Sequence, residues 1–272
     1  MTLGLSKLHY HMAIPLPIQQ LVDNSGNTFH AKVARWLQSE GWHIRVSPYY
    51  MDQSQHKARE IDLIAEKYWP IKDDFERWRG DVVIRLFVEC KFVPSHAVFW
   101  FTEKDIPAAE ELVCSRGAFR QNNTYTKEHH YLSTCARVAK VFASETNRGQ
   151  DFEPFYKALN QVLNAQVSMA GQSPSSPELK RRRGGSQIVI NYPIVVCSSF
   201  EKLYSTDFYD EIDPVQISDN FQLEVQYAYV DKAGNQRDDH FLVDFVEFSR
   251  LPEFALLIAR DAEVAAYLAP AH

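Results

Sequence analysis

Asp62, Glu89 and Lys91 stand in two largely apolar stretches of this chain, and their types and spacing suit a hydrolytic metal site. Asp62 lies in residues 59–65, and Glu89 and Lys91 lie in residues 82–92. Successive side chains of a strand point to opposite faces, so Glu89 and Lys91 project from the same face. If the strand of Asp62 is the antiparallel neighbour, two carboxylates meet beside one ammonium group. Two acidic oxygen ligands suit a hard divalent cation, and the lysine can orient or polarise a water.

This arrangement resembles the PD-(D/E)xK nuclease superfamily, whose fold is called restriction-endonuclease-like. Ile61-Asp62 stands in the place of the family's Pro-Asp, and Glu89-Cys90-Lys91 in the place of its Glu-x-Lys. The resemblance covers roughly the first two thirds of the chain. It implies that Asp62, Glu89 and the backbone carbonyl of Cys90 hold Mg²⁺ or Mn²⁺. It also implies that Lys91 orients or helps to deprotonate the attacking water.

A histidine occupies the place of an acidic residue that the family often carries in its first helix. The family's residue is a glutamate that follows an aromatic, whereas here Phe29 is followed by His30. A histidine can ligate a metal or hydrogen-bond a metal-bound water, but it adds no negative charge. His30 is therefore an accessory candidate for the site, and a solvent-facing histidine on a helix is an equally open interpretation.

Residues 119–144 are predicted to form a long helix in the basic part of the chain. Gln121 and Tyr125 are four residues apart and would share one face of that helix. This Gln-x-x-x-Tyr is similar to the motif of the RecB-like branch of the family. The resemblance implies that Gln121 belongs to the catalytic residues and that Arg120 and Tyr125 contact nucleic acid. An ordinary polar helix face is the alternative interpretation.

The order of predicted elements agrees with the resemblance. A helix from about residue 28 is ended by Gly41, and strands follow at residues 42–49, 58–66 and 82–92. Residues 68–80 are predicted to be an insertion before the third strand. A helix at residues 151–169 and a buried, apolar fourth core strand at residues 188–197 complete the core. A hairpin at residues 221–230 and 241–248 and a helix at residues 251–268 close the chain. We therefore expect an α/β fold with a restriction-endonuclease-like core, which is a mixed central sheet flanked by helices, followed by a C-terminal β-hairpin and helix.

One domain spanning residues 1–272 is the simplest organisation that these elements allow. It has a core at about residues 20–200, a mobile basic loop at about residues 170–186 and an acidic hairpin-plus-helix elaboration at about residues 201–272. The chain carries a net charge of −6. Residues 113–148 contain six basic and two acidic residues, whereas residues 199–272 contain five basic and fifteen acidic residues. The first segment could face phosphates, and the second would repel them and could dock a protein partner.

Composition and the absence of several motifs narrow the class of protein. A chain of 272 residues that is 45% hydrophobic and 24% charged is typical of a globular protein. Its four cysteines have no Cys-x-x-Cys spacing, which predicts reduced thiols in a cytoplasmic protein. The first twenty residues lack the pattern of a signal peptide, and no membrane span is expected. Without a Gly-x-x-x-x-Gly-Lys loop, no nucleotide cofactor is expected.

The sequence therefore predicts a metal-dependent nuclease that hydrolyses phosphodiester bonds of DNA, with a role in defence or repair. RNA stays open as a substrate, and a homodimer would supply the second site that cutting both strands usually requires. The alternative is a catalytically weak or inactive nuclease-fold protein. Such a protein would bind nucleic acid or a protein partner as a subunit of a larger assembly.

Overall fold

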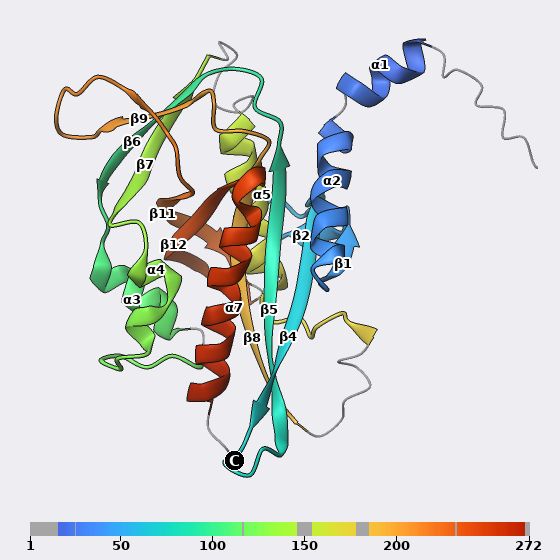
Figure 1. Cartoon of the computed structure of the whole chain (residues 1–272), viewed down its shortest axis with the longest axis vertical. Helices are drawn as coiled ribbons and strands as arrows, with labels where there is room; N and C mark the ends of the chain where they lie inside the picture. The colour runs from blue at the N-terminus through green and yellow to red at the C-terminus, as the bar shows by residue number, and fades with distance from the viewer. Residues whose placement is uncertain are drawn as a thin grey trace, which may run out of the picture.

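The computed structural model describes residues 16–24, 26–115, 117–145, 154–177, 185–231 and 233–269. Within these residues the chain has an α/β fold, as predicted (Figure 1). The strands are β1 (His43–Val46), β2 (Tyr49–Asp52), β3 (Lys57–Glu60), β4 (Leu63–Lys72), β5 (Trp78–Lys91), β6 (Ala97–Glu103), β7 (Arg137–Ser144), β8 (Ser186–Cys197), β9 (Leu203–Asp207), β10 (Val215–Gln216), β11 (Phe221–Val230) and β12 (Gln236–Glu247). The helices are α1 (Leu16–Asn24), α2 (Gly26–Ser39), α3 (Ile106–Cys114), α4 (His130–Ser133), α5 (Pro154–Met169) and α7 (Leu251–Leu268), with 3₁₀ turns η1 (Thr126–Glu128) and η3 (Phe248–Arg250).

A ten-stranded mixed sheet runs through the middle of the molecule. Its strand order is β1-β4-β5-β8-β12-β11-β7-β6-β9-β10, and β2 and β3 form a separate two-stranded sheet. Helix α5 covers one face of the large sheet, where it packs on Phe87 and Val195. Helices α2, α3 and α7 cover the other face, where they pack on side chains such as Val88 and Val196. The fold therefore has three layers, with helices on both sides of the sheet (Figure 1).

The helix and the strands predicted for the first part of the chain are present, with changed bounds. Helix α2 buries Val33, Ala34 and Leu37, and the chain leaves it through Gly41 at a φ of +80°, a conformation that glycine adopts without strain. Strands β1, β4 and β5 are antiparallel neighbours in this order. The predicted strand at residues 58–66 is interrupted at residues 61–62, because β3 pairs with β2 while β4 pairs with β5.

Two predictions about the middle of the chain are wrong. Residues 68–80 are not an insertion, because they extend β4 and β5 as one long hairpin to the pair Lys72 and Trp78. The long helix predicted for residues 119–144 is absent from the described residues there. Turns, η1 and the four-residue helix α4 occupy the first part, and the last part is β7. Strand β7 pairs with β6 and β11, and this sheet pairing outweighs the local helical pattern.

The fourth core strand is confirmed as β8. After β5 the chain forms β6, α3, α4 and β7 before it reaches α5, and it then enters β8, which is parallel to β5 with Glu89 beside Val195. The C-terminal hairpin is also confirmed, since β11 and β12 pair from Phe221 and Phe245 to Val230 and Gln236. Its strands lie between β8 and β7, so the acidic C-terminal segment is built into the sheet. Part of the predicted basic loop, including residues 180–183, lies outside the described residues.

The structure also bears on two coarser predictions. All four cysteines are free thiols. Among the helices of the described ranges, none has the length and apolar character needed to cross a membrane.

Candidate functional site

Asp62, Glu89 and Lys91 meet where β4 begins and β5 ends. Leu63 is opposite Val88 in the strand register, so the residues beyond this pair, Asp62 and Glu89, lie next to each other. The N–H of Asp62 donates to Oε1 of Glu89 over 3.3 Å. The Nζ of Lys91 lies 3.2 Å from Oε2 of the same carboxylate. The structure therefore brings together the three side chains that the sequence singled out.

The Cys90 backbone completes this group. The pairing of β5 with β4 ends at Val88, and the N–H of Cys90 donates to Oδ2 of Asp62 over 2.8 Å. The N–H and C=O of one residue in an extended strand point to the same side, so the Cys90 carbonyl is directed toward Asp62 as well. The Cys90 thiol lies on the other face, and burial together with Asp62 raises its pKa. Because the thiol lies on the other face, the carbonyl is the ligand that Cys90 can offer to the site.

The site lies at the carboxyl ends of parallel strands, which is a position that suits ligand binding. Strands β5, β8 and β12 are mutually parallel, and Lys91, Cys197 and Glu247 are neighbours at their carboxyl ends. The N–H of Ser198 donates to the Lys91 carbonyl over 2.9 Å, which fixes the end of β5. In open α/β sheets, ligands bind outside the carboxyl ends of parallel strands.

The electrostatics of the site favour a bound cation. The Glu89 residue is 1% exposed, and the side chain of Lys91 is 17% exposed. Burial and the neighbouring Asp62 raise the pKa of Glu89 to about 7, although Lys91 opposes this shift. Two carboxylates beside one ammonium group leave an excess of negative charge in a poorly solvated place. Two acidic oxygens and a backbone carbonyl are ligands that Mg²⁺ or Mn²⁺ prefers, so the residues present fit such an ion.

His30 is not part of a compact ligand set with Asp62 and Glu89. Helix α2 covers the sheet face that Val88 joins, whereas Glu89 and Lys91 project toward the α5 face. The Nε2 of His30 is buried and has no hydrogen-bond partner among the described residues. A direct contact between His30 and the carboxylates is therefore not seen.

Gln121, Tyr125 and Arg120 are far from the carboxylates. They lie in turns and not on a shared helix face, and Arg120 and Gln121 are exposed. The ring of Tyr125 packs at 5.2 Å on Tyr267, in the last turn of α7. Helix α7 begins near the strand ends that flank Lys91. It rises about 1.5 Å per residue, so Tyr267 lies about 24 Å along the helix from its start. The structure does not bring the Gln-x-x-x-Tyr residues to the site.

A basic cavity on the α5 face was not foreseen from the sequence. It has a volume of about 340 Å³ and lies between the β2-β3 hairpin and α5. Arg59 and Lys157 line it together with Tyr50, and its described lining includes no acidic residue. Tyr50 is close enough to Glu89 for the carboxylate to raise the pKa of its hydroxyl, although burial is the larger cause. Arg59 and Lys157 are about a hundred residues apart, so only the fold reveals their proximity.

A second group of ionisable residues is fully buried between α4 and α7. The ligand atoms of His129, His130 and Asp261 lie within 4.8 Å of one another. Asp261 accepts hydrogen bonds from the His130 ring, the His130 N–H and the Tyr192 hydroxyl, and His129 Nδ1 accepts from the N–H of Tyr131. Because these atoms are already satisfied by protein groups, we interpret this cluster as a polar network of the core.

Comparison with protein-family models, with curated proteins and with solved structures gives no match. The functional assignment therefore rests on the geometry and chemistry of the site.

Proposed function

We propose that this protein is a metal-dependent nuclease that hydrolyses phosphodiester bonds of DNA. The observation that carries the proposal is the convergence of Asp62, Glu89 and Lys91 at adjacent strand ends, with Lys91 Nζ 3.2 Å from Oε2 of Glu89. A pair of carboxylates beside one lysine is the minimum set for holding a divalent cation and orienting a water.

The order of elements around this group supports the proposal. Along the chain, α2 precedes the antiparallel strands β1, β4 and β5, and α5 precedes the parallel strand β8, with β2 and β3 inserted before β4 and the segment from β6 to β7 inserted before α5. Without these insertions, the order is similar to the helix, three-strand, helix, strand order expected of a restriction-endonuclease-like core. The acid precedes the second of these strands, and Glu-x-Lys ends the third, as in that family.

The chemistry would be hydrolysis by an activated water. The carboxylates of Asp62 and Glu89 and the carbonyl of Cys90 would hold Mg²⁺ or Mn²⁺, which supplies charge neutralisation at the phosphate. Lys91 holds the attacking water by a hydrogen bond and directs its oxygen at phosphorus. The water oxygen would form the new P–O bond as the bond to the leaving oxygen breaks, and the leaving oxygen would take a proton from a solvent water. The proton that the attacking water loses would pass to solvent, because Glu89 is engaged with the cation.

The basic cavity is the best candidate to seat the DNA backbone. Arg59 and Lys157 face it from the same side of the sheet to which Glu89 and Lys91 project. Arg59 is paired with Asp52 over 2.7 Å, which fixes the direction of its guanidinium group. Phosphate contacts of this kind would position the substrate without reading its sequence.

Plasmid cleavage tests this proposal. Supercoiled plasmid and labelled single-stranded DNA are incubated with Mg²⁺, Mn²⁺ or EDTA and with the wild type, Asp62→Ala or Lys91→Ala. We expect metal-dependent cutting by the wild type that both substitutions abolish. Asp74→Ala and Lys72→Ala, which change the same residue types in the distant β4-β5 turn, should leave cutting intact. A folded wild type that cuts neither DNA with either metal would contradict the proposal.

A further inference from the structure

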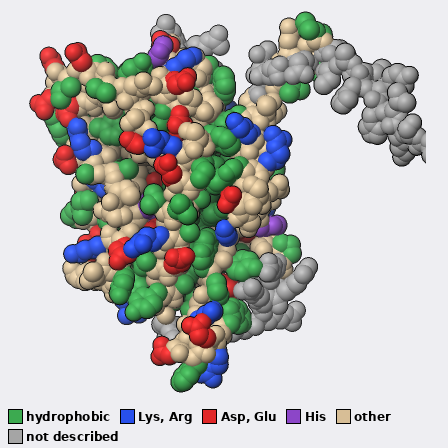
Figure 2. All heavy atoms as spheres, viewed as in Figure 1, with side chains coloured by type: hydrophobic (Ala, Val, Ile, Leu, Met, Phe, Trp, Pro, Cys, Tyr) green, Lys and Arg blue, Asp and Glu red, His purple; other side chains and the backbone are tan. Residues whose placement is uncertain are grey.

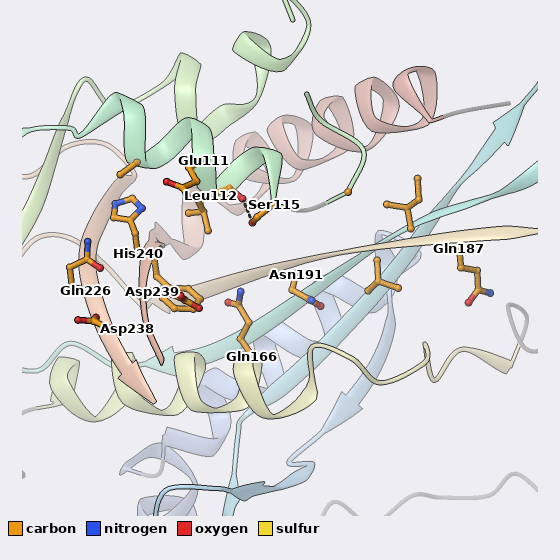
Figure 3. Close-up of a pocket in the computed structure, with 15 residues that line it drawn as sticks. Glu111, Leu112, Ser115, Gln166, Gln187, Asn191, Gln226, Asp238, Asp239 and His240 are labelled. Atoms are coloured by element: carbon orange, nitrogen blue, oxygen red, sulfur yellow. Dashed lines mark hydrogen bonds between the residues drawn. The ribbon is translucent and has the colours of Figure 1, made fainter. Parts of the chain in front are cut away.

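A cavity of about 800 Å³ opens through the sheet where β8 and β12 diverge. The two strands pair from Ile194 and Asp244 to Cys197 and Glu247, although β8 begins at Ser186 and β12 at Gln236. Helix α3 borders the cavity on one side of the sheet and α5 on the other (Figure 3). Asp62, Glu89 and Lys91 are not among its described lining residues, so it is separate from the proposed nuclease site.

Two side chains that line the cavity, one on each side of the sheet, carry buried polar atoms without hydrogen-bond partners in the part of the chain that the structure describes. Gln166 reaches from α5 toward β8 (Figure 3), and it is 7% exposed. Its Oε1 has no hydrogen-bond partner among the described residues, and neither has Nδ1 of His240. Nε2 of His240 also lacks a hydrogen bond of good geometry to these residues, although it lies 3.2 Å from Oε1 of Glu224. Buried polar atoms without partners are rare in folded proteins, and a ligand with several N–H donors would satisfy Oε1 of Gln166 and one nitrogen of the His240 ring.

The rim of the cavity is acidic. Glu111 of α3 and Asp238 and Asp239 of β12 line it and are exposed. Neither lysine nor arginine occurs among its described lining residues. The negative field of these carboxylates attracts cations and repels phosphates. The unpartnered atoms inside the cavity and the carboxylates at its rim therefore favour the same kind of ligand. Such a ligand carries a positive charge and several N–H donors.

We propose that this cavity binds a small organic cation with several N–H donors, either a polyamine or a guanidinium compound. The ammonium or guanidinium group lies between the rim carboxylates, and a further N–H reaches Oε1 of Gln166. The cavity volume falls within the range of about 300–1,000 Å³ that small-molecule sites occupy. This site is independent of the nuclease proposal, because the two share no described lining residue.

Isothermal titration calorimetry with spermidine and with agmatine tests this inference, and the stronger of the two identifies the class of cation. We expect saturable binding of at least one compound to the wild type at one site per chain. Gln166→Leu, and Asp238→Asn combined with Asp239→Asn, should each weaken it by about tenfold or more because charge-assisted hydrogen bonds are lost. Asp74→Asn combined with Glu76→Gln removes the same charge at the distant turn and should leave the affinity unchanged.

Three results would overturn the inference. The first is a lack of saturable binding of both compounds by folded wild type. The second is an equal loss of affinity in the Asp74 and Glu76 control, which would indicate nonspecific attraction to surface charge. The third is unchanged affinity in both cavity variants, each shown to be folded by its thermal transition.

Discussion

Glu66 and Glu89 are buried carboxylates on the neighbouring strands β4 and β5. Their surroundings differ, and the difference distinguishes a carboxylate that stabilises the fold from a candidate site residue. Glu66 accepts from Arg85 over 2.8 Å and from the Ser175 and Ser176 backbones, and its pKa is lowered because these bonds outweigh the cost of burial. Glu89 is held near a second carboxylate, and its pKa is raised to about 7. A buried carboxylate whose pKa is raised by burial and by a second carboxylate is typical of a functional site, where a bound ligand would stabilise its charged form.

Replacing Glu89 by glutamine should therefore not destabilise the metal-free protein. A raised folded pKa means that Glu89 lowers the free energy of unfolding as the pH rises from about 4.5 toward about 7. Glu89→Gln removes this effect while it keeps the shape of the side chain. Urea unfolding at pH 8 in EDTA should give a midpoint equal to or above that of the wild type. A clear loss of stability would show that Glu89 has a structural role.

Glu66→Gln is the matched control, because it makes the same change from carboxylate to amide at an equally buried position. It leaves Arg85 buried without its charged partner, and breaking a buried ion pair costs about 3–5 kcal/mol. The urea midpoint should fall strongly relative to the wild type in the same buffer. Equal midpoints for the two variants would contradict the distinction drawn between the carboxylates.

At the scale of elements, a buried ion network joins α4 to α7. Burial alone would lower the pKa of His130, but Asp261 and Asp244 raise it to about 9. Because the folded pKa exceeds the ordinary value of 6.5, the stability from His130 is fully present below pH 6.5 and is lost as the pH rises through about 9. The loss is at most about 3 kcal/mol.

Urea unfolding between pH 6 and pH 9.5 measures this dependence. The free energy of unfolding should fall with rising pH in the wild type, and the fall should be smaller in Asp244→Asn, which removes one of the charges that raise the pKa. A free energy that is constant over this range would mean that His130 stays neutral in the folded protein.

The start of the β5-β8 pair depends on a close backbone approach at Gly80. A Cβ atom placed there would lie 2.1 Å from the carbonyl oxygen of Ser186, which is backbone and cannot rotate away. Gly80→Ala should therefore push the two strands apart and cost about 1–3 kcal/mol. Gly26→Ala, where a Cβ meets no atom within 4 Å, should leave the thermal midpoint unchanged or slightly raised. Equal midpoints would indicate that the strands separate without cost.

The local sequence pattern predicted the elements whose secondary structure depends on their own residues. It failed for elements whose secondary structure depends on pairing with strands that are distant in the sequence. The apolar spacing of Val33 and Leu37 predicted α2, and the alternation of residues 82–92 predicted the carboxyl end of β5. The segment at residues 119–144 was mistaken for a helix because β7 becomes a strand through β6 and β11. The positions predicted for Gln121 and Tyr125 were therefore wrong. The proximity of Arg59 and Lys157 could not be predicted from the sequence, because the two residues are far apart along the chain and meet only in the fold. The site carboxylates were found because their charges contradicted their apolar surroundings.

At the scale of the whole molecule, the central position of β12 and β11 ties the C-terminal segment to the predicted core. These strands occupy the middle of the ten-stranded sheet, and α7 covers one face beside α2. A chain that ends at residue 200 would lose this hairpin and leave Val195 and Val196 beside an unpaired edge. We expect no cooperative unfolding transition from such a fragment by circular dichroism. A fragment that unfolds cooperatively would show that residues 20–200 form an independent core.

Acidic and basic residues gather on different surfaces of the protein, and these surfaces differ in whether they can contact DNA. Acidic side chains gather at the upper left in Figure 2, on the side where Figure 1 labels β9. Asp210 and Glu211, which follow β9 in the chain, are exposed. Exposed carboxylates repel DNA, whereas the basic cavity lies beside α5. We therefore expect DNA to approach from the α5 face.

Single-turnover cleavage of a labelled DNA duplex by the wild type and Lys91→Ala tests the central claim most directly, because the proposed role of Lys91 is to orient water without holding the metal. At saturating Mg²⁺ the account predicts that the substitution slows cleavage by about 10²-fold or more, with Mn²⁺ binding retained. Cleavage by Lys91→Ala at the wild-type rate, in a preparation free of other nucleases, would contradict the assignment of the Asp62, Glu89 and Lys91 group.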